Sequence, residues 1–318
     1  MRRVELFFVF LVEYCFIDGL SGLNWKQYDG FNPEEHENYK LLPPKNSCGT
    51  NGLGTQTESE KIVGGNETKL GEIPWIVQYG EYINGIFNFY CGASLISERY
   101  VLIAAHCNVV EFAEAYVRLG EWNTTEDPDS QGDLHAPPVQ DIKIAEIIPH
   151  KDYHSLKNDI ALIRLETTAT LGFFVQPVCL PYGAAMSKDF TNQDALAAGW
   201  GSIKGSDGPF PPTLLALKQT VADAEKCREA YAKIDKEVNY NDGKICFGGD
   251  EGKNVCFGDS GGPLLWKGSF EPDITVRTYL LGLTSYGPDR YKCALKGFPG
   301  VFTRTNFFMK WILDHMRA

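Results

Sequence analysis

Three short stretches, far apart in the chain, supply side chains that could act together on a substrate. His106 follows an apolar run, Asp159 precedes another, and Ser260 lies in the glycine-rich stretch Gly258–Pro263. A serine hydroxyl is a poor nucleophile at neutral pH, so it needs a neighbouring base, and that base needs a partner that fixes its tautomer. His106 can be the base and Asp159 its partner, and the three stretches therefore predict nucleophilic catalysis at Ser260.

The glycine-rich stretch also offers backbone donors. The N–H groups of Gly258 and Ser260 can converge on the oxygen of a tetrahedral intermediate, and loss of one such donor raises the barrier of other enzymes by ~3–4 kcal/mol. Taken singly, a histidine before a cysteine, an Asn-Asp pair and a Gly-Gly-Pro loop are each ordinary structural features. Their combination in one chain favours catalysis.

Short strands are expected to position these side chains. From Ile62 onward, short apolar runs rich in Val, Ile and aromatic residues alternate with Gly, Pro, Asn and Asp turns, which is typical of a closed or sandwiched β architecture. Two segments have helical character, 223–234 after an acidic start and 306–316 near the end of the chain. The strands that we expect are Trp75–Tyr79, Tyr100–Ala105, Tyr116–Glu121, Asp159–Leu165 and Leu280–Ser285.

Composition narrows the class of protein. The 318 residues are 43% apolar and 22% charged, which is typical of a globular protein. The 30 Lys and Arg against 41 Asp and Glu give a net charge of −11, which argues against a nucleic-acid binder with a basic face. After residue 20 no apolar run approaches the ~18–20 residues of a membrane helix. We expect a soluble protein with no nucleic-acid or membrane partner.

The first residues indicate export. Residues 1–21 combine two arginines, a seven-residue apolar stretch and small residues near position 21, as in a secretory signal peptide; a buried N-terminal strand is the alternative. Cleavage after this segment removes Cys15 and leaves eight cysteines, an even number suited to disulfides in an oxidising compartment. The sequons at Asn66 and Asn123 are compatible with glycosylation. A secreted, extracellular glycoprotein is expected.

Residues 22–61 differ from the rest of the chain. They are rich in Asn, Glu, Lys, Gly and Pro, with few apolar residues and a single cysteine, Cys48. Such a composition buries too little apolar surface to offset the entropy lost on ordering, so it predicts a mostly flexible tether.

In the order His, Asp, Ser, the three motifs resemble the trypsin/chymotrypsin family of serine proteases, and the resemblance covers residues 62–318. It implies an all-β fold of two packed antiparallel six-stranded β-barrels with a C-terminal helix. It implies His106, Asp159 and Ser260 as catalytic residues, with the N–H groups of Gly258 and Ser260 as the oxyanion hole. The implied reaction is hydrolysis of peptide bonds through an acyl-enzyme on Ser260, without a cofactor.

Within that family the chain is most similar to arthropod clip-domain-type proteases of extracellular cascades. The Cys48 tether and the stretches Gly120–Asn123 and Ala136–Ile142 carry this likeness. Two features depart from it. One cysteine in residues 22–61 cannot form a disulfide-knotted clip domain, and the loop between Trp122 and Ala136 lacks a cysteine pair.

The stretch Lys61-Ile62-Val63-Gly64-Gly65 resembles the family's activation site. The resemblance implies a zymogen in which a cut after Lys61 frees the α-amine of Ile62, which then pairs with Asp259. A buried ammonium–carboxylate pair is strong only when both partners are present, so the oxyanion loop of the zymogen is expected to be disordered. The alternative is that Lys61 is only a nickable site in a flexible segment.

The resemblance also implies that all eight mature cysteines are paired. One bond ties residues 22–61 to the catalytic chain, and the others bracket the histidine strand, close the helical excursion and staple the pocket walls. A metal site is the competing interpretation, but no Cys-x₂₋₄-Cys cluster supports it. The implied pairs are Cys48–Cys179, Cys91–Cys107, Cys227–Cys246 and Cys256–Cys293.

Alignment on the serine motif places the floor of the substrate pocket at Asn254, where trypsin-like relatives have an aspartate. An amide provides no counter-charge for a buried substrate cation, and Val255 removes a hydroxyl that would help to bind a basic group. We therefore expect weak cleavage after Lys or Arg and a preference for bulky apolar, aromatic or neutral polar residues. Asp250 and Glu251 are expected in a surface loop. The remaining pocket positions are Ser285, Tyr286, Gly287 and Gly300, the two glycines leaving room for large side chains.

The loop that begins at Glu121 is acidic, and relatives bind Ca²⁺ in this region through oxygen ligands. Two interpretations stay open here, a Ca²⁺ site and a solvated acidic loop. The other acidic residues of the loop are Glu126, Asp127, Asp129 and Asp133.

Two rival functions are weighed against an active protease. A catalytically silent homologue acting as a regulatory binding module should have lost a catalytic residue, whereas His106, Asp159 and Ser260 are all present. A lipase-like hydrolase shares the string Gly-x-Ser-x-Gly but has the chain order Ser, Asp, His. The expected partners are a protein or peptide substrate, an upstream trypsin-like activating protease and a serpin-type inhibitor, and the expected state is a monomer.

Overall fold

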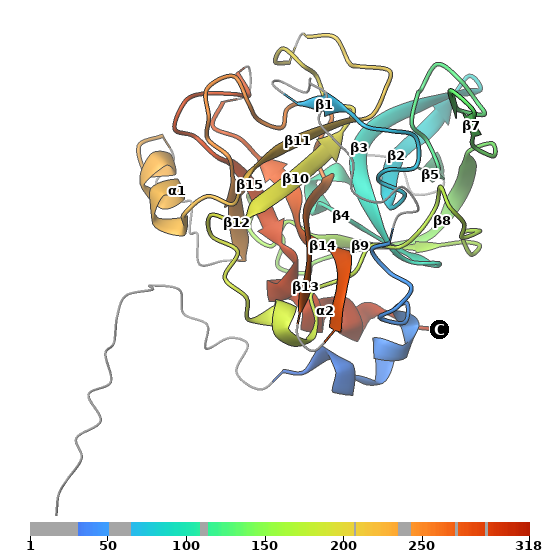
Figure 1. Ribbon diagram of the computed structural model, residues 1–318, viewed down its shortest axis with the longest axis horizontal. Coiled ribbons are helices and arrows are strands. Elements are labelled where there is room, and N and C mark those ends of the chain that lie inside the picture. Colours follow the sequence, from blue (N-terminus) through green and yellow to red (C-terminus); the bar gives the residue numbers. More distant parts are fainter. Residues whose placement is uncertain are drawn as a thin grey trace, which may run out of the picture.

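A computed structural model describes residues 31–50, 65–108, 114–206, 208–234, 243–270, 273–289 and 292–318. Two β units lie side by side, with a short C-terminal helix beneath them (Figure 1). Among the helices that it describes, none is both long and apolar enough to cross a membrane. The expected signal peptide, residues 1–21, lies outside the described residues.

The first unit, here called the barrel, is a closed antiparallel barrel of six strands in the order β2-β3-β4-β9-β8-β5. Buried and half-buried side chains alternate along β5, where the side chains of Ala115, Val117 and Leu119 are buried and those between them are half-buried. Strands with this period of two place every second side chain in the core. The strands are β2 (Ile76–Ile83), β3 (Ile86–Ser97), β4 (Tyr100–Ile103), β5 (Ala115–Leu119), β8 (Gln140–Pro149) and β9 (Ala161–Leu165).

The second unit, here called the C-terminal sheet, has seven strands in the order β1-β11-β10-β13-β14-β15-β12. The expected β fold of two packed units is confirmed, but the expected second six-stranded barrel is a sheet of seven strands that strand pairing leaves open. The ends of β11 and β12 approach each other through the isolated bridge between Val221 and Phe247. The strands are β1 (Asn66–Glu67), β10 (Asp194–Gly199), β11 (Leu215–Thr220), β12 (Lys244–Phe247), β13 (Pro263–Phe270), β14 (Asp273–Tyr286) and β15 (Gly300–Arg304).

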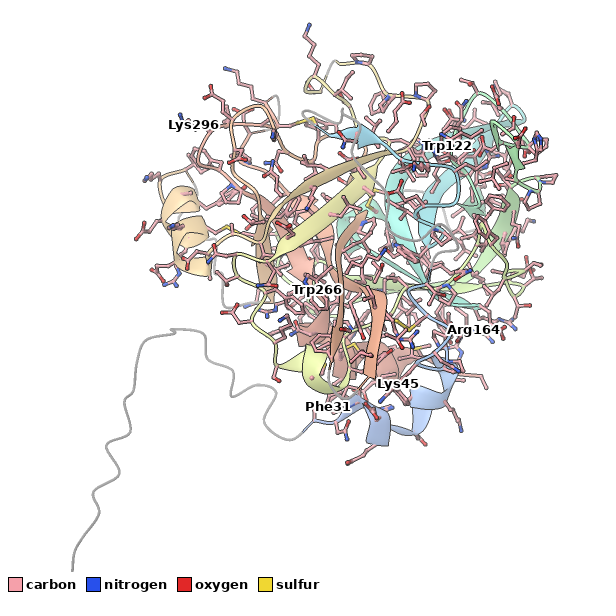
Figure 2. The ribbon with its side chains drawn as sticks, viewed as in Figure 1. Phe31, Lys45, Trp122, Arg164, Trp266 and Lys296 are labelled. Carbon is pink, nitrogen blue, oxygen red and sulfur yellow. A yellow bond between two sulfur atoms is a disulfide. The ribbon has the colours of Figure 1, made fainter. Side chains whose placement is uncertain are left out.

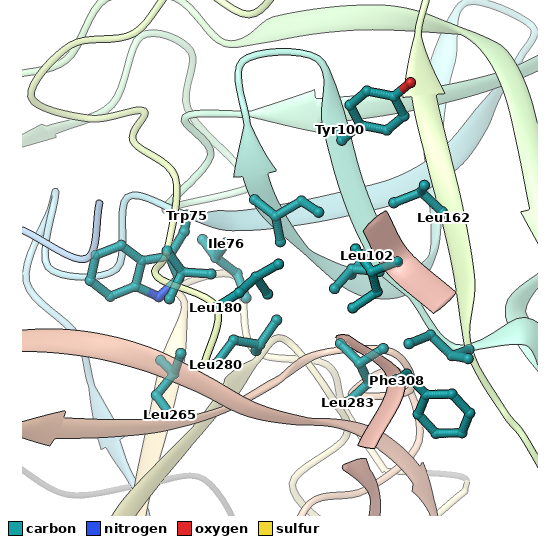
Figure 3. Close-up of a cluster of buried hydrophobic side chains, with 14 of the residues drawn as sticks. Trp75, Ile76, Tyr100, Leu102, Leu162, Leu180, Leu265, Leu280, Leu283 and Phe308 are labelled. Atoms are coloured by element: carbon teal, nitrogen blue, oxygen red, sulfur yellow. The ribbon is translucent and has the colours of Figure 1, made fainter. Parts of the chain in front are cut away.

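A continuous apolar core joins the two units. Trp75, Ile76 and Leu102 from the barrel side meet Leu265 and Leu283 from the C-terminal sheet (Figure 3). Burial of apolar side chains is the main favourable term in folding, so this shared core holds the two units together. A two-stranded ribbon, β6 (Ser130–Gln131) with β7 (Leu134–His135), lies outside both units.

Both expected helices are present, with shorter bounds. α1 spans Ala224–Tyr231, and the side chain of Asp223 accepts hydrogen bonds from two first-turn N–H groups as its N-cap. α2 spans Met309–His315 and continues a 3₁₀ turn at Thr305–Phe308. Its buried Met309, Ile312 and Leu313 extend the shared core.

Residues 31–50 are folded, and the expectation of a flexible tether is wrong for this part of the segment. Two short 3₁₀ helices, Pro33–Glu35 and Glu37–Leu41, lie against the end of α2. The Asn38 amide donates hydrogen bonds to the carbonyl oxygens of Leu313 and Met316, at 3.0 and 2.8 Å. These bonds satisfy carbonyl groups that a helix leaves without partners at its C-terminus, which a polar composition does not reveal.

The same segment is fixed at its other end. Lys45, labelled in Figure 2, pairs with Glu34 at 2.6 Å. Its ammonium lies over the ring of Tyr182. The disulfide between Cys48 and Cys179 then joins the segment covalently to the connection between β9 and β10. The other three expected disulfides are confirmed as well, namely Cys91–Cys107, Cys227–Cys246 and Cys256–Cys293.

Candidate active site

His106 and Asp159 form a hydrogen-bonded pair at one end of the barrel. His106 lies in a turn directly after β4, and Asp159 lies just before β9. Because Ile103 of β4 pairs with Ala161 of β9, the two neighbouring strands bring these side chains together. Asp159 Oδ2 lies 2.8 Å from His106 Nδ1, and Oδ1 accepts the backbone N–H of His106 at 2.9 Å.

This geometry fixes the tautomer of His106. Asp159 is fully buried, and an ionised carboxylate only accepts hydrogen bonds, so Nδ1 carries the proton and donates it. Nε2 then keeps a lone pair and can act as a base. Burial alone would raise the pKa of Asp159, but the hydrogen bond from His106 and the charges of His106 and Lys244 hold that pKa below its usual value.

Ser285 lies behind the carboxylate of Asp159. Its hydroxyl donates a hydrogen bond to Asp159 Oδ2 at 2.5 Å. The sequence placed Ser285 only among the pocket positions, because a serine near the end of an apolar strand carries no sign of which neighbour it meets. The structure adds Ser285 to the group of residues that orient Asp159.

The Ser260 turn packs between β14 of the C-terminal sheet and the end of β4, which leads to His106. Gly261 N–H donates to the Thr284 carbonyl at 2.8 Å, next to Ser285. A Cβ atom on Gly261 would lie 3.3 Å from the backbone nitrogen of Ala104, two residues before His106. The backbone of the Ser260 turn therefore lies close to the residues just before His106. Within the described part of the chain, no hydrogen bond joins the Ser260 hydroxyl to His106, and such bonds are commonly loose before substrate binds.

Backbone amides at this turn are available to a ligand. Gly258 has φ +91°, a conformation that side chains other than glycine rarely adopt. Among the described residues, no acceptor takes the N–H of Gly258 or of Ser260. The two donors predicted for an oxyanion hole thus have no acceptor in the part of the chain that the structure describes.

The side chain of Asp259 is buried beneath the turn. Its Oδ1 accepts the N–H of Gly201 and its Oδ2 the N–H of Cys256, both at 2.8 Å. A Cβ atom on Gly199 or Gly201 would lie 2.2 or 2.3 Å from the carboxyl group, so both glycines are required to make room for it. Burial raises the pKa of Asp259 to about 6, although the two backbone hydrogen bonds act in the opposite direction.

Asp259 has no counter-ion among the residues that the structure describes. An unpaired buried carboxylate is costly. Lys61 and Ile62, the predicted activation site, lie outside the described residues.

The predicted pocket floor is buried and neutral. Asn254 Oδ1 accepts the N–H of Val255 at 2.9 Å, and its amide donates to the Phe298 carbonyl at 3.3 Å. A Cβ atom on Gly300 would lie 2.6 Å from Asn254 Oδ1, so this glycine leaves the space in front of the amide. Tyr286 pairs with Val301, beside Gly300.

Three further positions behave as expected. A Cβ atom on Gly287 would meet nothing within 4 Å, so this residue leaves open space. Asp250 and Glu251 are exposed, and Glu251 lies 3.8 Å from Lys296 at the surface.

The sequence is similar to proteins that are already known, and this similarity agrees with the fold and the site described above. The family model described as Trypsin matches residues 62–312. The chain belongs to the trypsin family of serine endopeptidases. It is 34% identical to CLIP domain-containing serine protease B4 of Anopheles gambiae (86% of this chain, 74% of the relative) and 37% identical to phenoloxidase-activating factor 3 of Holotrichia diomphalia (87% and 77%). It is also 34% identical to Spaetzle-processing enzyme of Drosophila melanogaster (86% and 69%). The predicted likeness to arthropod clip-domain proteases of the trypsin family is confirmed.

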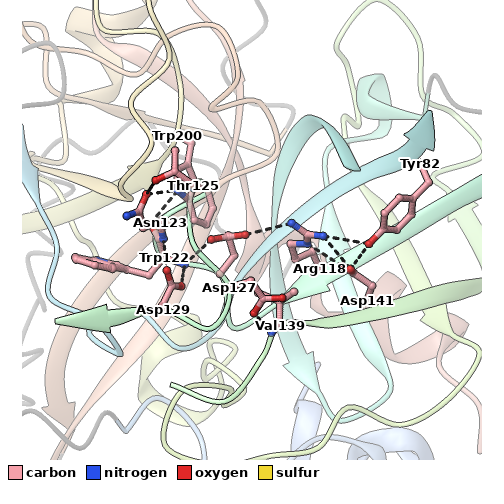
Figure 4. Close-up of polar contacts among 11 residues, drawn as sticks. Tyr82, Arg118, Trp122, Asn123, Thr125, Asp127, Asp129, Val139, Asp141 and Trp200 are labelled. Atoms are coloured by element: carbon pink, nitrogen blue, oxygen red, sulfur yellow. Dashed lines mark hydrogen bonds and ion pairs between the residues drawn. The ribbon is translucent and has the colours of Figure 1, made fainter. Parts of the chain in front are cut away.

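The acidic loop that begins at Glu121 is held by hydrogen-bond donors of the chain itself (Figure 4). Glu121 accepts hydrogen bonds from the Trp122 N–H at 3.1 Å and from Arg118 at 3.3 Å. Both oxygens of Asp129 accept backbone N–H groups, and Asp127 accepts the N–H of Val139. Burial, with the charge of Asp129, raises the pKa of Glu121 to about 7.

These contacts weigh against a Ca²⁺ site. Ca²⁺ takes six to eight oxygen ligands, whereas here a guanidinium occupies the place of a cation beside Glu121, and the Asp129 oxygens face N–H donors. Glu126 and Asp133 are exposed. The donor set does not fit Ca²⁺ and favours a loop supported by Arg118.

The two sequons lie in different surroundings. Asn66 is a half-buried residue of β1, and the hydroxyl of Thr68 donates to the Leu214 carbonyl. Asn123 Oδ1 accepts from both the N–H and the hydroxyl of Thr125. Glycosylation at these positions stays a prediction.

Proposed function

We propose that the chain is a secreted zymogen of a catalytically active endopeptidase, activated by cleavage after Lys61. The observation that carries the proposal is the buried His106–Asp159 pair, whose hydrogen-bonded Nδ1 leaves Nε2 as a base beside the Ser260 turn. No residue of the predicted triad is substituted.

The proposed reaction has two halves. Ser260 Oγ attacks the carbonyl carbon of the scissile bond while His106 Nε2 takes the hydroxyl proton, and the N–H groups of Gly258 and Ser260 bind the oxyanion. His106 then gives that proton to the leaving nitrogen as the C–N bond breaks, which leaves an ester on Ser260. A water molecule attacks the ester, passes a proton to His106, and Ser260 recovers its hydrogen. Asp159 stabilises the imidazolium in both halves.

Activation is proposed to act through Asp259. A cut after Lys61 creates an ammonium at Ile62, and pairing with the buried Asp259 carboxylate would supply the missing counter-charge. Asp259 lies between Gly258 and Ser260 in the sequence, so the position of its carboxylate sets the direction of the backbone N–H groups of both residues. A side chain at Gly199 or Gly201 would displace the Asp259 carboxylate from this position, so both residues must be glycine.

Specificity is proposed to follow from the neutral amide of Asn254. Transfer of a Lys or Arg side chain into a buried site without a carboxylate costs several kcal/mol, so bulky apolar, aromatic or neutral polar residues are preferred before the scissile bond. An enzyme with this preference cannot readily cut after its own Lys61. A separate trypsin-like protease is therefore proposed as its activator.

The biological setting is proposed from the relatives. Their names include a phenoloxidase-activating factor and a Spaetzle-processing enzyme, and each name refers to an action on another protein. A protein substrate in an extracellular proteolytic cascade, control by a serpin-type inhibitor and a monomeric state follow as parts of the proposal. The rival function is a silent homologue that only binds a partner.

Labelling of Ser260 separates the two functions. The full chain is cut after Lys61 with a trypsin-like protease, treated with a serine-directed phosphonate and analysed by mass spectrometry. We expect one label on Ser260 in the cut chain, little label in the uncut chain, and none in the Ser260→Ala control. A cut chain that stays unlabelled and hydrolyses no peptide would overturn catalysis in favour of the binding module.

Peptides varied at the residue before the scissile bond then test the pocket. We expect Phe, Tyr or Leu substrates to be cleaved with higher kcat/KM than Arg or Lys substrates. An Asn254→Asp variant should reverse this order, because it restores a buried counter-charge. Preference of the unmodified enzyme for Arg or Lys would refute the proposed specificity.

A further inference from the structure

A buried lysine lies behind the carboxylate of Asp159. Lys244 is the first residue of β12 and is 5% exposed. Its ammonium donates hydrogen bonds to the Ser285 hydroxyl at 3.2 Å, to the Thr303 hydroxyl at 3.3 Å and to the Leu156 carbonyl at 2.6 Å. Buried lysines are rare unless their charge is compensated, so these partners show a built position rather than a solvated surface charge.

One of these bonds continues into the catalytic pair. Ser285 has a single hydroxyl hydrogen, which it donates to Asp159 Oδ2, so it can only accept from Lys244. Asp159 Oδ2 in turn accepts from His106 Nδ1. The ammonium is thus two hydrogen bonds from the carboxylate and three from the imidazole, in surroundings that are largely closed to water.

A second bond reaches the loop that leads into Asp159. Ser155, Leu156 and Asn158 have φ values of +46°, +67° and +50°, a conformation that costs free energy for residues with side chains. Such residues persist only where their surroundings hold them. Because Lys244 belongs to the C-terminal sheet and binds the Leu156 carbonyl, it fixes this loop of the barrel from outside.

The charges that face Asp159 define the electrostatic effect. His106 and Lys244 are the cationic groups acting on the carboxylate. Tyr153 faces it as a neutral phenol, whose pKa is raised by burial and by the charge of Asp159, and the ring of Tyr286 lies 5.5 Å from the Lys244 ammonium. The other titratable residues between β8 and β9 are the half-buried His150, whose ring packs against Phe308 and Trp311, and the exposed Lys151, Asp152, His154 and Lys157.

We infer that Lys244 is a positioning residue of the catalytic site, which sets the pH range in which His106 acts as a base and holds the strained loop before Asp159. The inference rests on the proposed function, because it requires His106 to act as a base. A carboxylate alone stabilises the imidazolium and keeps histidine protonated to higher pH. The ammonium of Lys244 opposes the effect of the carboxylate, so loss of its charge should change the pH range in which the enzyme is active.

Substitution of Lys244 tests the inference. In the cut enzyme, Lys244→Met removes the charge at nearly constant length, and the acid limb of the kcat/KM–pH profile should move to higher pH by about one unit. Lys244→Arg restores the charge and should return the limb toward that of the unmodified enzyme. Lys267→Met removes a lysine from the exposed face of β13 and should leave the profile unchanged.

Two additional measurements separate the possible failures. Lys244→Gln keeps a donor for the Leu156 carbonyl, so it should show the same displacement of the limb even where Lys244→Met does not fold. The imidazole titration of His106 is followed by NMR in a Ser260→Ala background, which requires no catalysis. A titration and an acid limb that do not move in the neutral variants would overturn the role of Lys244. A cut enzyme without activity, but with the NMR shift, would overturn the proposed function alone.

Discussion

The carboxyl group of Asp259 should make the stability of the uncut chain depend on pH. Burial raises its pKa from 3.8 to about 6 in the folded protein. The folded state therefore binds a proton more tightly than the unfolded state between these values. Its stabilising contribution is present at low pH and is lost as pH rises through about 6. An Asp259→Asn variant has no such proton and should lose this dependence.

The magnitude follows from the two pKa values. Each unit of difference corresponds to about 1.4 kcal/mol, so the full effect across the window is ~3 kcal/mol. Between pH 5 and pH 8 the linkage relation gives a loss of ~1.4 kcal/mol in the free energy of unfolding. Asparagine has one acceptor oxygen and cannot accept from both Gly201 and Cys256, which costs ~1–3 kcal/mol. That cost is the same at both pH values, so it cancels in the difference.

Urea unfolding of the uncut chain measures this difference. Both proteins carry Ser260→Ala to prevent self-cleavage, and the free energies of unfolding are compared at pH 5 and pH 8. The gap between the chain that keeps Asp259 and the Asp259→Asn variant should shift by ~1.4 kcal/mol in favour of the variant as pH rises. Asp250→Asn, which neutralises an exposed carboxylate, is the matched control and should show no such shift.

Cleavage after Lys61 should reverse the sign of the contribution that Asp259 makes to the pH dependence of the free energy of unfolding. If the Ile62 ammonium pairs with Asp259, the pKa of this carboxyl falls below its unfolded value, so its contribution is present at neutral pH and is lost as pH falls. Asp259→Asn should then be more destabilising at pH 8 than at pH 5. A gap that changes identically with pH in cut and uncut chains would refute the switch, and a gap independent of pH in the uncut chain would refute the burial argument.

Other positions give shorter tests. Arg118→Met leaves Glu121 buried without its cation and should lower the free energy of unfolding by ~2–4 kcal/mol at pH 8. EDTA should not change the Tm of the unmodified chain. A fall in Tm on chelation would contradict the conclusion that Arg118, and not Ca²⁺, supports the acidic loop. Asn38→Ala removes two hydrogen bonds to the end of α2 and should cost ~1–2 kcal/mol in urea unfolding, where an unchanged midpoint would count against this contact. Replacing Cys48 and Cys179 by serine should let the segment before Ile62 separate from the cut enzyme on a denaturing gel, whereas the unmodified chain should separate only after reduction.

The sequence revealed those features that are carried by local motifs. His106, Asp159 and Ser260 each lie in a short stretch with its own character, and the strand-rich pattern around them predicted the fold. The four disulfides followed from the family resemblance. These features are encoded by residue type and order, which a single sequence displays.

Features that depend on a distant partner were missed. Lys244 precedes an apolar strand and has the appearance of an ordinary solvated charge, but its ammonium meets partners 41, 59 and 88 residues away. Ser285 likewise meets Asp159 across 126 residues. The segment 31–50 looked too polar to fold, because its main contacts are with the C-terminal helix rather than within itself.

The missed contacts share a location that explains their importance. His106 and Asp159 belong to the barrel, whereas Ser260 follows β12 in the C-terminal sheet, so the site exists only where the two units meet. The shared apolar core fixes the distance between the units, but it is non-directional and cannot orient a carboxylate. Hydrogen bonds are directional and can orient it. The bond of Ser285 to Asp159 and the bond of Lys244 to Leu156 both join the C-terminal sheet to the barrel. Directional contacts from the sheet therefore complete an orientation of the His106–Asp159 pair that the barrel alone does not determine.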